Sequence, residues 1–219
     1  MHPLAPLLLG RETRRGTIHV SRSFHIIVVA ASAGGLDALS RILSQLPASF
    51  PAALAIVQHR ALSSPHLLAE ILRQRTKLTV KDAADCDEPR PGVAYVAPPG
   101  IHLIVDARQR FALIDGAKVK HARPSGDLLF ASAAEAFGPR VIALVLTGGD
   151  GDGSGGLSMV KKHGGIVISQ DEASARDPSM PKAAIATGDV DYILPLAYIA
   201  STLEGLVLGG GMTADARVG

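Results

Sequence analysis

Apolar runs and helical patterns alternate along most of the chain. Residues 25–31 read HIIVVAA, a continuous run rich in β-branched residues that stops at the small residues Ser32-Ala33-Gly34-Gly35. Apolar side chains then recur at helical spacing, at Leu36, Leu39, Ile42, Leu43 and Leu46. A second apolar run, 52–57, is followed by Ser63-Ser64-Pro65 and by a helical face at Leu67, Leu68, Ile71 and Leu72. This alternation predicts parallel strands joined by right-handed helical crossovers.

The middle of the chain, residues 78–114, has a different pattern. Its short apolar segments are separated by turn residues such as Pro98-Pro99-Gly100 and are typical of hairpins, so we expect an antiparallel insertion or sheet edge there. Afterwards the alternation returns, with helices predicted at 127–137, through Leu157 and Val160, after Pro181 and around 196–206, and strands at 141–146 and 166–169. The predicted fold class is α/β: a doubly wound, mainly parallel sheet with helices on both faces and a small antiparallel hairpin region.

Length and composition favour one main domain. The chain has 219 residues, 47% of them hydrophobic, which is enough for one substantial core, and we place that domain at residues 23–207. Residues 1–22 are interpreted as a leader or flexible arm and residues 208–219 as a flexible tail. The apolar run 3–9 precedes its basic residues, whereas a secretory signal begins with them. No apolar stretch reaches the roughly 20 residues that span a bilayer, so we expect no membrane insertion.

Charge and cysteine content exclude further classes of protein. The net charge is +2, the basic residues are scattered and no aromatic residues are interleaved with them, which argues against nucleic acid as a partner. Acidic partners stay open. The single cysteine, Cys86, has no second thiol to pair with and no nearby His-x-His cluster, so we expect a reducing, cytoplasmic compartment and no metal site at this residue. We also expect no cofactor.

Three polar residues follow predicted strands and are the first candidates for chemistry. Ser32 comes after 24–31, His59 after 52–57, and Asp152 lies in the glycine-rich turn after 141–146. Ligands of parallel sheets sit beyond the carboxyl ends of the strands, and a serine nucleophile needs a histidine base that a carboxylate orients. Ser32 also opens a helix, whose N–H groups could point at a developing oxyanion. The three residues follow one another along the chain as Ser, His, Asp, whereas the triad of α/β hydrolases runs Ser, Asp, His, and the Gly-x-Ser-x-Gly motif of those enzymes is absent.

Each candidate also has a structural interpretation. Ser32 could be only an N-cap, and His59 only a hydrogen-bonded loop residue. Asp152 could be a cap or a calcium ligand, because Asp150, Asp152, Ser154 and Gly155 fit the opening of an EF-hand loop. The twelfth position of that loop is Lys161 rather than glutamate, which disfavours calcium. The glycine-rich turn lacks Gly-Lys-Ser/Thr, and residues 32–35 lack Gly-x-Gly-x-x-Gly, so nucleotide binding is disfavoured as well.

An ordered set of motifs resembles the catalytic domain of the chemotaxis receptor methylesterases and covers about residues 24–205. The set consists of Ala31-Ser32-Ala33-Gly34-Gly35 with Leu39, Val57-Gln58-His59, Ala97-Pro98-Pro99 with His102-Leu103, Arg123-Pro124-Ser125 with Asp127, Leu129 and Phe130, Leu146-Thr147-Gly148 with Asp152-Gly153, Gln170-Asp171-Glu172-Ala173, and Met180-Pro181. One such motif would say little, but the whole set in this order is specific.

The resemblance implies a serine esterase of signal transduction. The family hydrolyses the γ-methyl ester of glutamate on chemoreceptor helices, and many members also deamidate receptor glutamines. By resemblance, Ser32, His59 and Asp152 form the catalytic triad, and the backbone N–H groups of Ala33 and Gly149 hold the oxyanion. The expected partners are the cytoplasmic helices of methylated chemoreceptors or another methyl-esterified protein.

Several features depart from the family pattern. Ala30 replaces the usual glycine before Ala-Ser, Arg60 replaces a methionine after Gln-His, and Gly149 replaces a methionine after Thr-Gly. Typical members also carry an N-terminal receiver domain, for which some 23 residues leave no room, so we expect either a stand-alone, constitutively open homologue or a shortened form of a longer protein. The alternative to an esterase is a signalling or docking module on the same fold that has no catalytic turnover. Basic residues are candidate contacts to an acidic helix, namely Arg60, Arg123, Lys161 and Lys162, while His102 and Met180 are expected near the cleft or in the core.

Overall fold

The structure, a computed structural model, describes residues 24–60 and 67–209. The predicted leader (1–22), most of the predicted tail (210–219) and Ser63-Ser64-Pro65 lie outside the described residues. The strands are β1 (His25–Ala31), β2 (Ala52–Gln58), β3 (Thr79–Asp82), β4 (Val93–Val96), β5 (His102–Val105), β6 (Phe111–Ile114), β7 (Val141–Val145), β8 (Ile166–Gln170) and β9 (Tyr192–Leu194). The helices are α1 (Gly35–Gln45), α2 (Leu68–Arg73), α3 (Gly126–Phe137), the 3₁₀ turn η1 (Gly138–Arg140), α4 (Leu157–Lys162), α5 (Ser179–Ile185) and α6 (Leu196–Val207).

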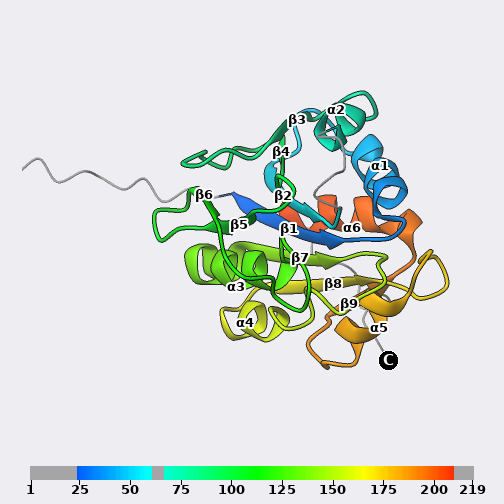
Figure 1. Cartoon of the computed structure of the whole chain (residues 1–219). Helices are drawn as coiled ribbons and strands as arrows, with labels where there is room; N and C mark the ends of the chain where they lie inside the picture. Colours follow the sequence, from blue (N-terminus) through cyan, green and yellow to red (C-terminus); the bar gives the residue numbers. More distant parts are fainter. Residues whose placement is uncertain (1–23, 61–66, 210–219) are drawn as a thin grey trace, which may run out of the picture.

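A seven-stranded sheet forms the centre of the molecule, in the order β3-β4-β2-β1-β7-β8-β9 (Figure 1). Every neighbouring pair in it is parallel. The predicted α/β class with a mainly parallel sheet is confirmed, as is a small antiparallel region, the hairpin β5–β6.

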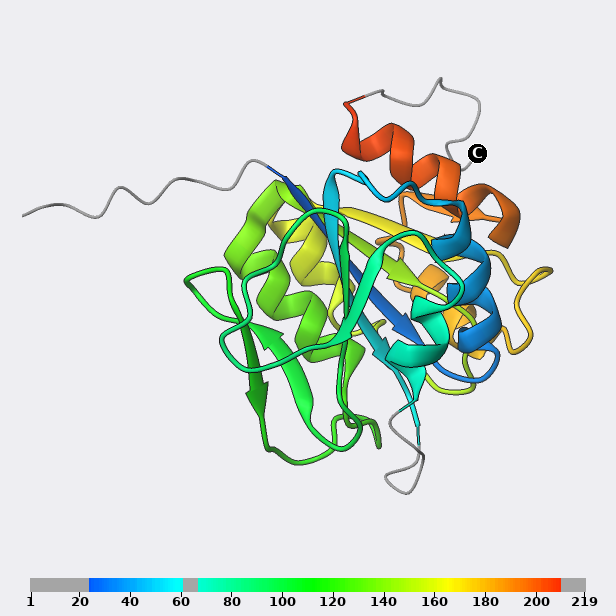
Figure 2. The same cartoon turned by 90° about the horizontal axis from the view of Figure 1, so that it is seen from above.

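Helices cover both faces of this sheet, as the two views show (Figures 1 and 2). One core lies under α1, α2 and α6 and takes alternate side chains of β1, beginning with Ile27. The other lies under α3, α4, α5 and the β5–β6 hairpin and takes the intervening side chains, beginning with Ile26. Because both faces are covered, β1 and β2 are almost wholly buried, which explains their unbroken apolar sequence.

The structure corrects the prediction for the middle of the chain. β3 lies at the edge of the main sheet, as one alternative of the prediction had it, but β3 and its neighbour β4 are parallel strands of that sheet rather than parts of hairpins. Short segments such as 93–96 carry no signal for strand direction, because the side-chain pattern is the same in both orientations. The three-residue strand β9 was not predicted. On α2, Leu67 is exposed and precedes the helix, whereas Leu68 and Leu72 are buried as expected.

Strand register brings three chain segments to one edge of the sheet. Ala31, the last residue of β1, is paired with Gln58, the last residue of β2. On the other side of β1, Ala30 is paired with Val145, the last residue of β7. The residues that follow these three adjacent strands therefore emerge side by side.

Candidate active site

Ser32 is half-buried at the junction between β1 and α1. Its N–H donates to the Thr147 carbonyl at 2.9 Å, and its own carbonyl accepts from Gln58 Nε2 at 2.7 Å. Gly34 has a φ of 83°, the left-handed region that glycine adopts without strain, and this lets the chain turn from strand to helix. The Ser32 side chain is thereby held beside the N-terminus of α1.

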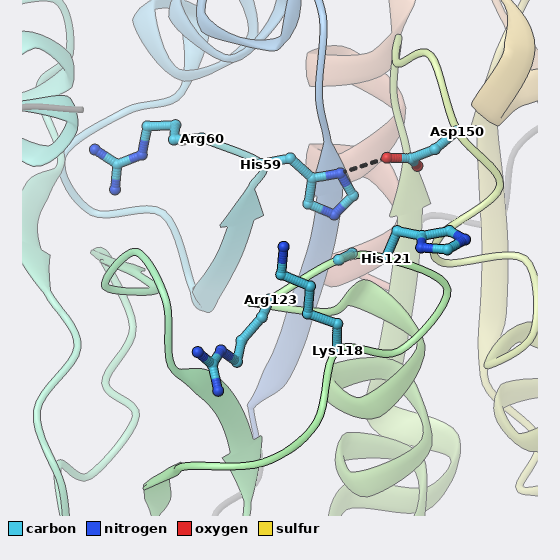
Figure 3. Close-up of a pocket in the computed structure, with 7 residues that line it drawn as sticks. His59, Arg60, Lys118, His121, Arg123 and Asp150 are labelled. Carbon is cyan, nitrogen blue, oxygen red and sulfur yellow. Dashed lines mark hydrogen bonds and ion pairs between the residues drawn. The ribbon is translucent and has the colours of Figure 1, made fainter. Parts of the chain in front are cut away.

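His59 follows β2 and lies beside Ser32 across the strand pair. Its N–H donates to the Ala31 carbonyl at 2.9 Å, and its side chain is only 13% exposed. Nε2 lies 2.8 Å from Asp152 Oδ2. Nδ1 lies 2.9 Å from Asp150 Oδ2, and Figure 3 marks this second contact with a dashed line. Within the described part of the chain, no hydrogen bond joins the Ser32 hydroxyl to the imidazole.

Asp152 is fully buried and lies at the N-terminus of α3. Besides His59, its carboxylate accepts hydrogen bonds from Ser125 Oγ at 2.7 Å, from the Gly126 N–H and from the Asp127 N–H at 3.2 Å. A helix N-terminus stabilises negative charge through its dipole and its unpaired N–H groups. The Arg-Pro-Ser motif, noticed in the sequence only as part of the resemblance, thus supplies the hydroxyl that helps hold this carboxylate.

These contacts shift the protonation of both groups. Burial alone would raise the pKa of Asp152, but hydrogen bonds from His59, Ser125 and Gly126 outweigh it and lower the pKa. Burial alone would lower the pKa of His59, but hydrogen bonds to Asp150 and Asp152, together with their charges, raise it to about 9. At neutral pH the imidazole in this arrangement is therefore a cation between two carboxylates.

Asp150 is the residue that sequence reasoning missed as a partner of His59. It was considered only as a calcium ligand, but both Asp150 and Asp152 direct their carboxylates at the imidazole. Among the residues that the structure describes, no cluster of three or more His, Cys, Asp or Glu side chains could hold a metal ion. The sequence gives no signal for this contact, because it depends on how the 149–153 turn folds back.

Two backbone N–H groups near Ser32 are available to a ligand. Neither Ala33 nor Gly149 donates its N–H to a hydrogen bond within residues 24–60 and 67–209. The intervening Gly148 N–H is used, because it donates to the Asp177 carbonyl at 2.9 Å. Thr147 fixes this loop: its N–H donates to Gln170 Oε1 at 3.0 Å and its hydroxyl to the Ala33 carbonyl at 2.8 Å.

Glycines allow close packing around the site. A Cβ on Gly148 would lie 2.0 Å from Met180 Sδ and 2.8 Å from Ser32 Cβ. Met180 is fully buried in the core and packs against Gly148 of the active-site loop. Both predicted locations, the core and the neighbourhood of the cleft, therefore apply to it. The methyl group of Ala30, where glycine was expected, faces Gly126 and Gly153, at each of which a Cβ would come within 3.2 Å of it or closer. The extra methyl group is accommodated because the facing backbones carry no side chains.

A pocket beside His59 is rich in basic side chains. Its lining residues are His59, Arg60, Lys118, His121, Ala122, Arg123 and Asp150 (Figure 3). Two of the four basic residues predicted as partner contacts, Arg60 and Arg123, line this pocket. Lys161 and Lys162 do not, and Lys161 forms an ion pair with Asp191. His102 is buried and bonds the Ala117 carbonyl at 3.0 Å, which is a structural role.

Comparison with known proteins identifies the family. The sequence profile of the CheB methylesterase family matches residues 27–203. The chain belongs to the CheB methylesterase family. The crystal structure of the Thermotoga maritima CheB methylesterase catalytic domain superimposes with a TM-score of 0.82 at 38% identity, covering 84% of this chain and all of that one. The chemotaxis methylesterase resemblance drawn from the motifs is thus confirmed.

Relatives of CheB type differ in how much of their length this chain matches. A Leptospira interrogans protein is 37% identical over 178 residues, which are 81% of this chain and 92% of that protein. The protein-glutamate methylesterase/protein-glutamine glutaminase of Clostridium acetobutylicum is 35% identical over 94% of this chain and 59% of its own length. Protein-glutamate methylesterase FrzG of Myxococcus xanthus is 39% identical over 82% of this chain, which spans about half the length of that relative (54%).

Proposed function

We propose that this CheB-family chain is a protein-glutamate methylesterase in which Ser32 is the nucleophile, His59 the general base and acid, and Asp152 the carboxylate that orients the imidazole. The contact between His59 and the buried Asp152, just beyond the paired strand ends Ala31 and Gln58, is the observation that carries the proposal. The relatives named above, whose printed names describe glutamate methylesterases, support the substrate class.

The reaction needs one imidazole nitrogen free for the Ser32 hydroxyl. His59 takes the hydroxyl proton while Ser32 Oγ attacks the ester carbonyl, and the N–H groups of Ala33 and Gly149 stabilise the oxyanion, each worth about 10²–10³ in rate. His59 then protonates the departing methoxide, and methanol leaves. Water, deprotonated by His59, then attacks the acyl-enzyme; His59 returns the proton to Ser32 Oγ, and the substrate protein leaves with a free glutamate side chain.

The same acyl-enzyme serves a second reaction. If the substrate is a glutamine side chain, His59 protonates the departing amide nitrogen, which leaves as ammonia in place of methanol, and the later steps are unchanged. We therefore include protein-glutamine deamidation in the proposal, in line with the glutaminase activity in the name of the Clostridium acetobutylicum relative.

We assign the basic pocket to partner recognition. Its cationic side chains lie next to His59 and fit the acidic surface of a methylated chemoreceptor-type helix. We propose the cytoplasm as the location of this reaction, because chemoreceptor-type substrates present their methylated helices there. No helix among residues 24–60 and 67–209 is long and apolar enough to cross a membrane.

Two measurements test the proposal. Methanol release from methylated receptor membranes should be lost in Ser32→Ala and retained in the control Ser44→Ala, which removes an exposed hydroxyl on α1. A fluorophosphonate probe should label Ser32 in the wild type and not in His59→Ala. A folded protein that neither releases methanol nor takes up the probe would indicate the alternative, a docking module without turnover.

A further inference from the structure

Both ring nitrogens of His59 are bonded to carboxylates. Nε2 is 2.8 Å from Asp152 and Nδ1 is 2.9 Å from Asp150. An imidazole has only these two nitrogens, and a serine nucleophile needs one of them as proton acceptor. Because Asp152 is fixed in the protein interior, Asp150 and Ser32 compete for the same remaining nitrogen.

We propose that Asp150 is a positioning residue that holds His59 in a resting arrangement and must leave Nδ1 before Ser32 can be activated, an inference that rests on the proposed hydrolase function. Asp150 acts through His59 rather than on the substrate. Its role is thus separate from that of Asp152, although both are aspartates of one turn.

The surroundings of the two carboxylates hold Asp152 in place and leave Asp150 freer to move. Asp152 is fully buried and has three donors besides His59. The Asp150 side chain is 38% exposed, and within the described residues its one other hydrogen bond is from the Asp152 N–H, at 3.1 Å. Gly149 and Gly151 flank it, and glycine gives the backbone freedom to rotate. Turning the Asp150 carboxylate away from His59 therefore breaks fewer hydrogen bonds and exposes less buried charge than the same movement of Asp152 would.

The charges around His59 set the direction of the effect. Apart from the two aspartates in contact, the charged or titratable groups that line its pocket or lie near Asp150 are Arg60, Lys118, His121, Arg123 and Asp177. Burial opposes protonation of the imidazole, yet the two direct carboxylate contacts raise the pKa of His59 to about 9. With this pKa only about one imidazole in a hundred is neutral at pH 7. Removing one adjacent carboxylate lowers a histidine pKa by about one unit or more.

The test compares the pH dependence of serine activation in the whole chain. The rate of Ser32 labelling by a fluorophosphonate is measured between pH 5.5 and 10.5 for the wild type, Asp150→Asn and the control Asp115→Asn. Asparagine keeps the shape of residue 150 and its bond to the Asp152 N–H. The control removes a carboxylate that is bonded to Arg123 at the same pocket and does not touch His59.

The expected result is a midpoint at least one pH unit lower in Asp150→Asn, with labelling about tenfold faster at pH 7 and equal to that of the wild type above pH 10. Asp115→Asn should keep the wild-type midpoint. An unchanged midpoint in Asp150→Asn, an equal shift in both variants, or slower labelling of Asp150→Asn at every pH would overturn the inference. If Asp150→Asn does not fold, Asp150→Ser takes its place.

A direct titration separates this inference from the proposed function. The ¹⁵N resonances of the His59 imidazole report its protonation whether or not Ser32 reacts. A midpoint near 9 that falls in Asp150→Asn supports the role of Asp150, and one that does not move refutes it. Absence of probe labelling in all variants at all pH values would instead count against the hydrolase itself.

Discussion

Gly148 lies in the loop after β7 and faces the Ser32 side chain, and Gly148→Ala tests how tightly the loop and the side chain are packed. The added Cβ would be 2.0 Å from Met180 Sδ and 2.8 Å from Ser32 Cβ, whereas non-bonded heavy atoms settle at about 3.5–4.0 Å. Met180 is fully buried and cannot swing into solvent. The loop, Met180 or Ser32 must therefore move by about 1 Å or more to reach an ordinary contact distance.

We expect two effects of Gly148→Ala. Overpacking should lower the free energy of unfolding by about 1–3 kcal/mol, measured by urea denaturation. Displacement by about 1 Å of the Ser32 hydroxyl, or of the loop that carries the Gly149 N–H, should slow fluorophosphonate labelling of Ser32 by about 10²-fold. The control is Gly116→Ala, where the new Cβ would make only ordinary contacts, with His102 Cδ2 at 3.5 Å and Nε2 at 3.9 Å.

A double variant separates the two contacts. Met180→Ala removes the sulfur that the new Cβ would meet. The loss of unfolding free energy in the double variant Gly148→Ala/Met180→Ala should therefore be smaller than the sum of the losses in the two single variants. Labelling should remain slow, because the Ser32 Cβ contact persists. If Gly148→Ala and Gly116→Ala behave alike in both assays, the packing argument for this loop is wrong.

Ser125→Ala removes a buried hydroxyl that donates to the Asp152 carboxylate at 2.7 Å, so we expect a loss of about 1.5–3 kcal/mol in urea unfolding, against less than about 0.5 kcal/mol for the exposed Ser44→Ala. A loss as small as that of the control would contradict the assigned hydrogen bond. The His59 imidazolium should stabilise the fold fully below pH 6.5, its ordinary pKa, and progressively less as pH rises through about 9. The difference in unfolding free energy between wild type and His59→Gln should shrink over that window, and a difference that grows would refute the pairing.

Much of the architecture could be predicted from local patterns. The buried runs that became β1, β2, β7 and β8 are long and apolar, and each precedes a small or polar residue, so both the strands and the candidate residues at their ends were recognisable. The rule that parallel strands present ligands at their carboxyl ends then selected Ser32 and His59. These predictions depended on continuous segments of sequence and required no knowledge of loop geometry.

The parts that escaped prediction depend on long-range geometry. β3 and β4 are short, and pairing direction is decided by the neighbouring strand rather than by their own residues. The second carboxylate on His59 arises because the 149–153 turn folds back across the end of β1, which the glycine-rich sequence allows but does not dictate. Ser125 acquires its role in the same way, through the position of α3 relative to that turn.

The pairing of Ala31 with Gln58 has a consequence for how this site can vary. Adjacent strands are spaced about 4.8 Å apart by their backbone hydrogen bonds, so the serine and the histidine that follow them inherit a separation that side-chain substitutions elsewhere leave intact. The acidic groups reach the imidazole from a loop and have no such constraint. Insertions or exchanges in that loop can therefore retune the acidity of the base while the two reacting side chains keep their spacing.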